Sequence, residues 1–377
     1  MPRRDLGPGR TVERMSTIGA RASGRWRRAA TWAAEVGRPR RVPVWLWRVL
    51  MHSVKRAELA RFNADPITAV DYDLDLDFVG DGIRAHRLDV ISPRAAAAAP
   101  TASVGPLPVY VYFHGGGWTS GDKDTLTKYC ASQARHGMVV VNVNYRRATR
   151  FRMTHIMHDA DAALAWVRTH IAEYGGDPDR IVLGGDSAGG QISALLTASA
   201  RRPALAAHYR LTEAPRPATA RAICGLVQHC SVVDFSVLFE RGFIMGLGFV
   251  RMLLPGAARS VTREQLRRAV RPLSPIEWVD ESFPPVFLTT SERDYFYRAN
   301  LNFLRRLRER GVHVEELIYD RDTPNTLHTW QQFAGFPESQ EVYRRLQAFV
   351  RAVAAPARGH HAGAVAAPAQ EQTAQVH

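Results

Sequence analysis

The sequence predicts an α/β protein built on a mostly parallel sheet of about eight strands with helices on both faces. Short apolar, β-branched runs alternate along the chain with stretches of helical periodicity, which is typical of this class. Two glycine-rich motifs each follow such a run directly, where a parallel strand would end at the edge of the sheet. The 377 residues are 46% hydrophobic, which is enough for a large buried core.

The strands are expected in eight short apolar runs. These runs are residues 72–79, 83–91, 109–113, 139–145, 181–184, 223–228, 286–290 and 312–319. Between them, apolar residues at helical spacing predict core-facing helices within residues 156–171, 301–307 and 342–353. Gly311 is the expected C-terminal cap of the second of these helices.

One stretch interrupts the alternation of strands and helices. Residues 231–275 carry apolar, helix-like patches without a clear strand, which indicates an inserted cap of helices over the sheet. Residues 43–62 either contribute to this cap or form an ordinary packing helix. Together these features predict one catalytic domain over residues 43–354, with a basic N-terminal arm (1–42) and a tail (355–377) that are expected to be disordered.

The net charge of +14 is concentrated near the N-terminus. Residues 1–50 hold twelve arginines against three acidic residues, so the body of the chain is only slightly basic and no nucleic-acid partner is expected. The arm precedes an apolar patch at residues 44–51, and this arrangement suggests weak contact with anionic membrane surfaces. An unstructured extension, or a true start at Met15, explains the arm equally well.

Cysteine use and hydropathy indicate where the chain works. Three scattered cysteines without a C-x-x-C pair do not form a disulfide framework. No secretory signal is apparent in the arm, and the apolar run at 44–51 is far shorter than the roughly 20 residues of a membrane span. Residence in the cytoplasm is therefore expected.

A candidate nucleophile lies in the sequence Gly-Asp-Ser-Ala-Gly at residues 185–189, between a predicted strand and a predicted helix. A serine at such a sharp turn has a strained backbone that only small neighbours permit, and its hydroxyl projects at the carboxyl edge of the sheet. The helix N-terminus beneath it favours developing negative charge. The motif therefore predicts that Ser187 attacks an acyl group.

The second glycine-rich motif is His-Gly-Gly-Gly-Trp at residues 114–118, after the predicted strand 109–113. Consecutive glycines expose backbone N–H groups that can stabilise the oxyanion of a tetrahedral intermediate. We expect the N–H groups of Gly115, Gly116 and Ala188 to be these donors. A phosphate-binding loop is disfavoured because neither phosphate-loop pattern fits residues 115–123.

A serine nucleophile needs a base, and the base needs a carboxylate that orients it. In this architecture the chain order is serine, acid, histidine, which favours Asp294 after one late strand and His328 after the next. Glu292, in the same loop as Asp294, is the competing acid. Three other candidates are placed less suitably for these roles, namely Asp320, Asp322 and His313.

A metal site is the remaining catalytic alternative. His155 and His158 would lie near each other on one helix, but no clear third ligand accompanies them. We therefore expect neither a metal nor a cofactor.

Several motifs together resemble the hormone-sensitive-lipase-like branch of the α/β-hydrolases, which includes bacterial carboxylesterases and acetylesterases. The resemblance covers about residues 70–352. It rests on residues 114–118, residues 185–190, Glu-Tyr-Gly-Gly-Asp-Pro at 173–178, the prolines at 284–285, and Asp294 and His328 in order. It implies the α/β-hydrolase fold, a helical cap, an oxyanion hole and metal-independent hydrolysis of short- to medium-chain carboxylic esters.

The sequence departs from the family pattern at residues 144–148, at Tyr295-Phe296 and at Thr329-Trp330, which leaves the shape of the substrate pocket open. Side chains expected to line this pocket, or else to pack in the core, are Trp118, Phe243, Met245 and Phe249. Two alternatives to an esterase stay open. One is an amidase or formamidase with the same triad, and the other is a ligand receptor on this fold that does not turn over its ligand.

Overall fold

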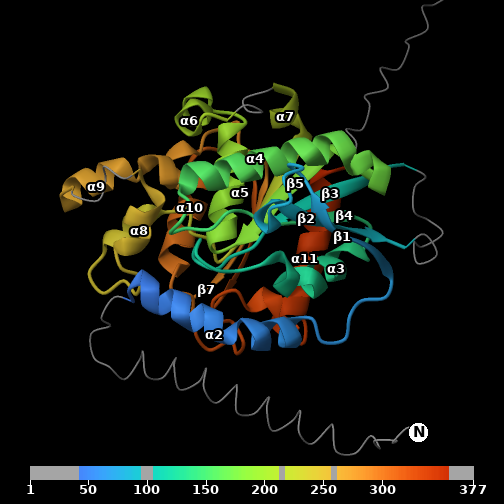
Figure 1. Ribbon diagram of the computed structural model, residues 1–377, viewed down its shortest axis with the longest axis horizontal. Helices are drawn as coiled ribbons and strands as arrows, with labels where there is room; N and C mark the ends of the chain where they lie inside the picture. The colour runs from blue at the N-terminus through green and yellow to red at the C-terminus, as the bar shows by residue number, and fades with distance from the viewer. Residues whose placement is uncertain (1–41, 95–104, 212–216, 256–260, 356–377) are drawn as a thin grey trace, which may run out of the picture.

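The computed structural model describes residues 42–94, 105–211, 217–255 and 261–355 (Figure 1). The predicted basic arm and C-terminal tail lie almost entirely outside these residues, and so does the arm's expected membrane contact. Among the helices in the described ranges, none combines the length and the hydropathy needed to cross a membrane.

An eight-stranded sheet forms the centre of the molecule, in the order β1-β2-β4-β3-β5-β6-β7-β8. Its strands are β1 (Val70–Asp77), β2 (Arg87–Pro93), β3 (Leu107–Phe113), β4 (Val139–Val143), β5 (Gly176–Asp186), β6 (Ile223–His229), β7 (Val286–Ser291) and β8 (Val314–Tyr319). β2 pairs antiparallel with both β1 and β4, and all other neighbours are parallel. This confirms the predicted fold class and all eight predicted strands.

The largest boundary difference is at β5, which begins at Gly176 and not at residue 181, and β1 and β2 also differ from their predicted bounds. β1 ends at Asp77 because the Asp77 carboxylate accepts hydrogen bonds from the backbone N–H groups of Val79, Gly80 and Gly82, which closes a turn. The chain then forms the short 3₁₀ helix η1 (Arg84–His86) before β2 begins. Aspartate favours such turns because its side chain competes for backbone donors.

Helices cover both faces of the sheet (Figure 1). The α-helices are α2 (Val44–Phe62), α3 (Thr127–Ala134), α4 (Met153–His170), α5 (Ala188–Ser199), α6 (Pro203–Tyr209), α7 (Pro217–Ala222), α8 (Gly248–Leu253), α9 (Arg263–Ala269), α10 (Tyr297–Glu309) and α11 (Pro337–Val353). The 3₁₀ helices after η1 are η3 (Lys123–Leu126), η4 (Ile171–Tyr174), η5 (Phe235–Phe239), η7 (Arg271–Leu273), η8 (Pro275–Trp278) and η9 (Trp330–Gln332).

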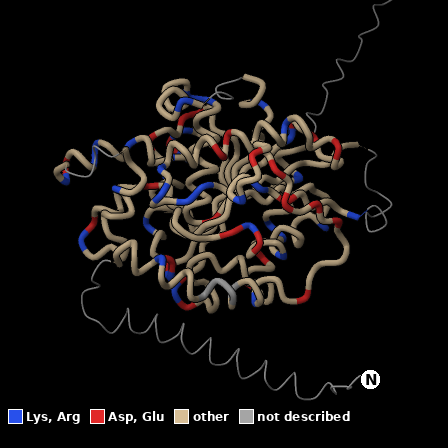
Figure 2. Tube along the Cα trace, viewed as in Figure 1, with Lys and Arg blue, Asp and Glu red and all other residues tan. Residues whose placement is uncertain are grey.

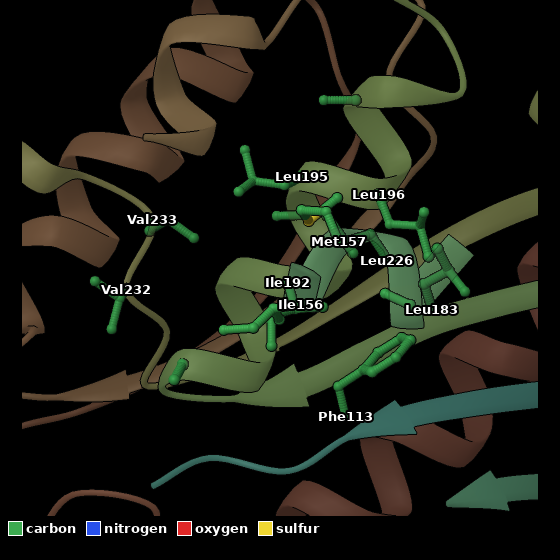
Figure 3. Packing of buried hydrophobic residues seen from close by; sticks show 14 of the residues in the cluster. Phe113, Ile156, Met157, Leu183, Ile192, Leu195, Leu196, Leu226, Val232 and Val233 are labelled. Atoms are coloured by element: carbon green, nitrogen blue, oxygen red, sulfur yellow. The ribbon is translucent and has the colours of Figure 1, made fainter. Parts of the chain in front are cut away.

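The alternation of side chains along β3 separates the two layers of the core. Val111 and Phe113 pack into the cluster that contains α4, α5 and α10, whereas Tyr110 and Tyr112 pack into the cluster that contains α3 and α11. Figure 3 shows Ile192 of α5 within the first of these clusters. Because α5 is buried in this cluster, its position relative to β5, the strand that precedes it, is fixed.

Between β6 and β7 the chain forms η5, α8, α9, η7 and η8, and its described residues contain no strand. We call residues 231–255 and 261–275 the β6–β7 insertion. The backbone before α2 joins this insertion, because the Val42 N–H donates to the Ile244 carbonyl at 2.8 Å and Val42 forms an isolated bridge with Met245. The two segments that the sequence suggested as parts of a cap are therefore in contact.

Charged residues are distributed over the described part of the chain with both signs interspersed (Figure 2). Lys123 is an exception to surface exposure, since it is buried with its ammonium 2.6 Å from Asp89 and 2.8 Å from Asp75. Pairing of this kind is what permits a lysine to be buried at all. Most of the net charge of the chain comes from residues 1–50 and not from the folded body.

Candidate active site

Ser187 lies at the turn between β5 and α5 with φ 50° and ψ −115°, a conformation that is strained for any residue with a Cβ. Two backbone hydrogen bonds hold the turn, one from Ser187 N–H to the His229 carbonyl (3.0 Å) and one from Val232 N–H to the Ser187 carbonyl (3.1 Å). The flanking glycines are required, because a Cβ on Gly189 would collide with the Phe113 carbonyl oxygen. The predicted sharp turn at residues 185–189, which we call the elbow, is thus held by the backbone of three neighbouring strands.

Asp294 and His328 meet at the same edge of the sheet, in the loops after β7 and β8. His328 Nδ1 lies 2.8 Å from Asp294 Oδ1. Because a carboxylate only accepts hydrogen bonds, Nδ1 carries the proton and Nε2 keeps its lone pair. The structure therefore brings together the acid and the base that the chain order predicted.

The Asp294 carboxylate is fully buried and is oriented by further donors. The Phe296 N–H donates to Oδ1 at 3.0 Å, and the Thr290 hydroxyl donates to Oδ2 at 3.3 Å. The competing acid, Glu292, is exposed and accepts instead from the Arg321 N–H. Local hydrogen bonding therefore distinguishes two acids that lie only two positions apart in the sequence.

Two aromatic rings pack against the imidazole of His328. The Tyr295 ring centroid lies 4.1 Å from that of His328, and the Phe296 centroid lies 5.8 Å away. Phe243, from the β6–β7 insertion, packs on Phe296 at 5.5 Å. Burial and the nearby Asp294 carboxylate raise the pKa of Tyr295 well above its ordinary value, so its phenol stays neutral. The two residues that depart from the family pattern, Tyr295 and Phe296, thus pack against His328.

The glycine-rich loop after β3 corrects one predicted oxyanion donor. Gly115 N–H donates to Asp186 Oδ1 at 3.0 Å, so this group already has an acceptor within the protein. Within the described ranges, the N–H groups of Gly116 and Gly117 have no recorded partner, and both glycines have positive φ (111° and 59°). The Ala188 N–H is the first of α5 and has no intrahelical acceptor.

Asp186, the residue before the nucleophile, links three parts of the site. Its Oδ1 also accepts from the Tyr112 hydroxyl at 2.6 Å, and its Oδ2 accepts from Gln332 Nε2 at 3.0 Å. Burial raises the pKa of Asp186, while the Tyr112 hydrogen bond acts in the opposite direction. Through this carboxylate, the nucleophile turn, the glycine-rich loop and the loop that carries His328 are joined.

The predicted pocket residues divide into two groups. Trp118, Met245 and Phe249 are buried, and Trp118 Nε1 donates to Gln191 Oε1 at 2.7 Å, so these side chains pack in the core. Packing explains all three without a bound substrate. Phe243 is only partly buried and packs on Phe296, the ring that contacts His328.

The discounted residues have other partners or an exposed position. His155 Nδ1 accepts from the Arg152 N–H at 3.3 Å, and His158 Nε2 donates to the Tyr209 carbonyl at 2.7 Å. Asp320 accepts from the Thr323 N–H at 2.8 Å. The other two are exposed, namely His313 and Asp322.

Cys230 is a neighbour of Asp294 and His328 that the sequence did not reveal. Its Sγ, a carboxylate oxygen of Asp294 and a ring nitrogen of His328 all lie within 4.8 Å of one another. Burial raises the pKa of the thiol well above its ordinary value. Cysteine, aspartate and histidine are ligands that zinc accepts, but here the aspartate and the histidine are hydrogen-bonded to each other.

Comparisons with known proteins show the family and the fold of the chain. A family model described as the alpha/beta hydrolase fold matches residues 110–331. The carboxylesterase NlhH of Mycobacterium tuberculosis strain H37Rv is 33% identical over 232 residues, which cover 60% of this chain and 68% of that protein. The probable carboxylic ester hydrolase LipM of the same organism is 28% identical over 262 residues, covering 69% of this chain and 56% of LipM.

Among solved structures, esterase B from Lactobacillus rhamnosis matches with a TM-score of 0.69 and 19% identity, covering 82% of this chain and 94% of that one. A bacterial heroin esterase matches with a TM-score of 0.62 and 21% identity, covering 84% and 94%. At these identities the two matches support the fold alone.

Proposed function

The chain belongs to the hormone-sensitive-lipase-like branch of the α/β-hydrolases, and from this premise we propose that it hydrolyses short- to medium-chain carboxylic esters through a covalent acyl-serine intermediate. The observation that carries the proposal is the 2.8 Å hydrogen bond between His328 Nδ1 and Asp294 Oδ1 at the sheet edge where Ser187 occupies its strained turn. Ester hydrolysis is the activity named for its relatives.

In the acylation step, Ser187 Oγ attacks the ester carbonyl carbon while His328 Nε2 accepts the hydroxyl proton. Asp294 keeps the imidazole in the required tautomer and stabilises the imidazolium that forms. The tetrahedral intermediate then collapses, the bond to the alcohol oxygen breaks, and His328 returns the proton to this leaving group.

The oxyanion of this intermediate needs donors that are already oriented. We assign this role to the N–H groups of Gly116, Gly117 and Ala188, since the Gly115 N–H is bound to Asp186. Each such donor typically contributes about 3 kcal/mol to transition-state stabilisation. The carbonyl oxygen would then lie between the glycine-rich loop and the start of α5.

In the deacylation step, water replaces the alcohol. His328 takes a proton from the water, the hydroxide attacks the acyl carbon, and a second tetrahedral intermediate forms at the same donors. Its collapse breaks the bond to Ser187 Oγ, which regains the proton from His328. The products are a carboxylic acid and the free enzyme.

We assign the acyl pocket to a cap formed by the β6–β7 insertion together with α2. Two contacts support this assignment: the hydrogen bond from Val42 to Ile244, and the edge-to-face contact of Trp47 with Phe249 at 6.3 Å. From this cap, Phe243 packs on Phe296, whose ring contacts His328. The preferred acyl length is expected to depend on Phe243.

The proposal is tested with p-nitrophenyl esters from acetate to palmitate, comparing the wild type with Ser187→Ala. Activity that is highest on short chains and absent from the variant supports the esterase. A folded wild type that is inactive on all esters contradicts it. Activity on an aryl formamide would then favour the amidase, and ligand binding without turnover would favour the receptor.

We further propose that the enzyme works in the cytoplasm. The three cysteines are unpaired, and Cys130 and Cys230 are buried as thiols, which fits a reducing compartment. Separating a cell lysate into cytosolic, membrane and secreted fractions tests this directly.

A further inference from the structure

The first half of α2 exposes a continuous apolar face. Its outward side chains, with their exposed fractions, are Trp45 (65%), Leu46 (40%), Val49 (60%) and Leu50 (41%). These are four of the nine large hydrophobic residues exposed in the described chain, and they lie within six consecutive positions. Such clustering distinguishes a binding surface from the scattered apolar residues of any protein surface.

The helix has a second, inward face of equally regular spacing. Val44, Trp47 and Met51, at positions i, i+3 and i+7, point toward the body of the protein and are partly buried. With this face fixed, Trp45 and Val49 are held one turn apart on the outside. Figure 1 shows α2 along the outside of the molecule.

Positive charge accompanies the apolar face. The exposed Arg48 flanks the exposed apolar face. The chain that leads directly into α2, residues 1–41, contains eleven arginines against three acidic residues. Apolar residues beside concentrated arginine are the combination that binds the boundary of an anionic lipid layer.

The inner face of α2 contacts the catalytic machinery. Trp47 Nε1 lies 3.5 Å from the Gly116 carbonyl oxygen, to which it donates a weak hydrogen bond. A Cβ placed on Gly117 would lie only 3.0 Å from the same nitrogen. The exposed face of α2 is therefore separated from the proposed oxyanion loop by the thickness of one helix.

We propose that the outer face of the first half of α2 is a docking surface for an anionic lipid interface, with the arginine-rich segment before it supplying the electrostatic attraction. A second copy of the chain is the less favourable occupant, because two chains that each carry a net charge of +14 repel each other. This inference goes beyond the proposed function, since lipid binding does not require hydrolysis. Docking by this face would also bring the proposed oxyanion loop close to the lipid interface, from which an apolar ester would enter the active site.

The test is sedimentation of the full chain with vesicles of equal parts phosphatidylglycerol and phosphatidylcholine, and with vesicles of phosphatidylcholine alone. We expect binding to the anionic vesicles, weakened by added salt. The double variant Trp45→Ser/Val49→Ser should bind these vesicles at least about tenfold more weakly than the wild type. The matched control is Val79→Ser/Ile83→Ser, which removes two apolar residues that are each 49% exposed elsewhere, and it should bind like the wild type.

Activity on soluble p-nitrophenyl butyrate separates this inference from the proposed function, because both double variants should retain it. Unchanged vesicle binding by Trp45→Ser/Val49→Ser would overturn the docking surface, and so would a wild type that does not bind anionic vesicles at low salt. A dimer in lipid-free solution that dissociates only in Trp45→Ser/Val49→Ser would also overturn it, because the face would then belong to a second copy.

Discussion

The carboxyl edge of the sheet and the layer formed by α2 and the β6–β7 insertion are built in different ways. At the sheet edge, Ser187 and Asp294 are buried and bound by backbone donors and acceptors. In the outer layer, the first half of α2 has a row of exposed apolar side chains, and the insertion consists of short helices. In our proposals the sheet edge carries out the chemistry, whereas the outer layer selects the substrate and binds the lipid surface.

The largest effect is expected from removing the base. His328→Ala should lower kcat about ten thousandfold, because His328 is the base that we propose accepts the serine proton. The melting temperature should change little, since His328 is partly exposed in a loop. Steady-state kinetics and thermal unfolding of the same preparation measure both. A variant that keeps a tenth of the wild-type kcat would assign the base to another residue.

The next effect concerns the close packing of the elbow. Gly189→Ala should destabilise the protein by more than about 3 kcal/mol, since the new methyl group would overlap the Phe113 carbonyl. Gly335→Ala is the matched control, because a Cβ there has open space and its φ is not positive. It should change the free energy of unfolding in urea by less than about 0.5 kcal/mol. Equal effects of the two variants would contradict the claimed rigidity of the elbow.

The sheet edge should also make the fold sensitive to acid. His229, which accepts the Ser187 N–H through its carbonyl, is buried, and burial lowers the pKa of its imidazole to about 3. In the unfolded chain this pKa is about 6.5, so the unfolded state gains a proton first as the pH falls. The free energy of unfolding should therefore decrease by about 2 kcal/mol between pH 7.5 and pH 5 on account of His229.

His229→Gln should lack this contribution to the acid sensitivity. Urea unfolding of the variant and the wild type at both pH values checks the difference. The same loss of stability in the two proteins would show that His229 gains its proton equally in the folded and unfolded states.

A smaller effect on catalysis is expected from the hydrogen bond that joins Gln332 to Asp186. Gln332→Ala removes one donor to Asp186 and should lower kcat about tenfold with little change in KM, because it disturbs the position of the oxyanion donors. Gln340→Ala, at an exposed glutamine of the following helix, should leave both constants unchanged. A change confined to KM would instead place Gln332 in substrate binding.

The smallest effect is expected in the outer layer, where it should change selectivity rather than catalysis. Phe243→Ala should raise kcat/KM on octanoate relative to acetate about fivefold, because the space beside Phe296 becomes available to the acyl chain. Activity on acetate should stay close to that of the wild type. If the variant instead lost activity on every chain length, Phe243 would be a support of the catalytic base.

Features carried by local sequence were predictable. All eight strands, the elbow at Ser187 and the acid and base in chain order follow from periodicity and from motifs a few residues long. The choice of Gly115 as a donor was wrong because the direction of its N–H depends on Asp186, which lies 71 positions away. No short pattern reports such a contact.

Other parts of the site depend on contacts of still longer range. Gln332 reaches Asp186 across 146 positions, and Cys230 meets Asp294 only because β6 and β7 are adjacent strands. The burial of Trp118 could not be separated from pocket lining, since an aromatic residue suits both roles.

The central claim is that Ser187 becomes acylated because His328 and Asp294 activate it. The most direct measurement is mass spectrometry of the protein after treatment with a p-nitrophenyl alkylphosphonate, which reacts only with an activated serine and leaves a stable adduct. We predict one adduct per chain, located on the peptide that contains Ser187, with loss of esterase activity in proportion and no adduct in His328→Ala. An adduct on a different serine, or equal labelling of His328→Ala, would contradict the account.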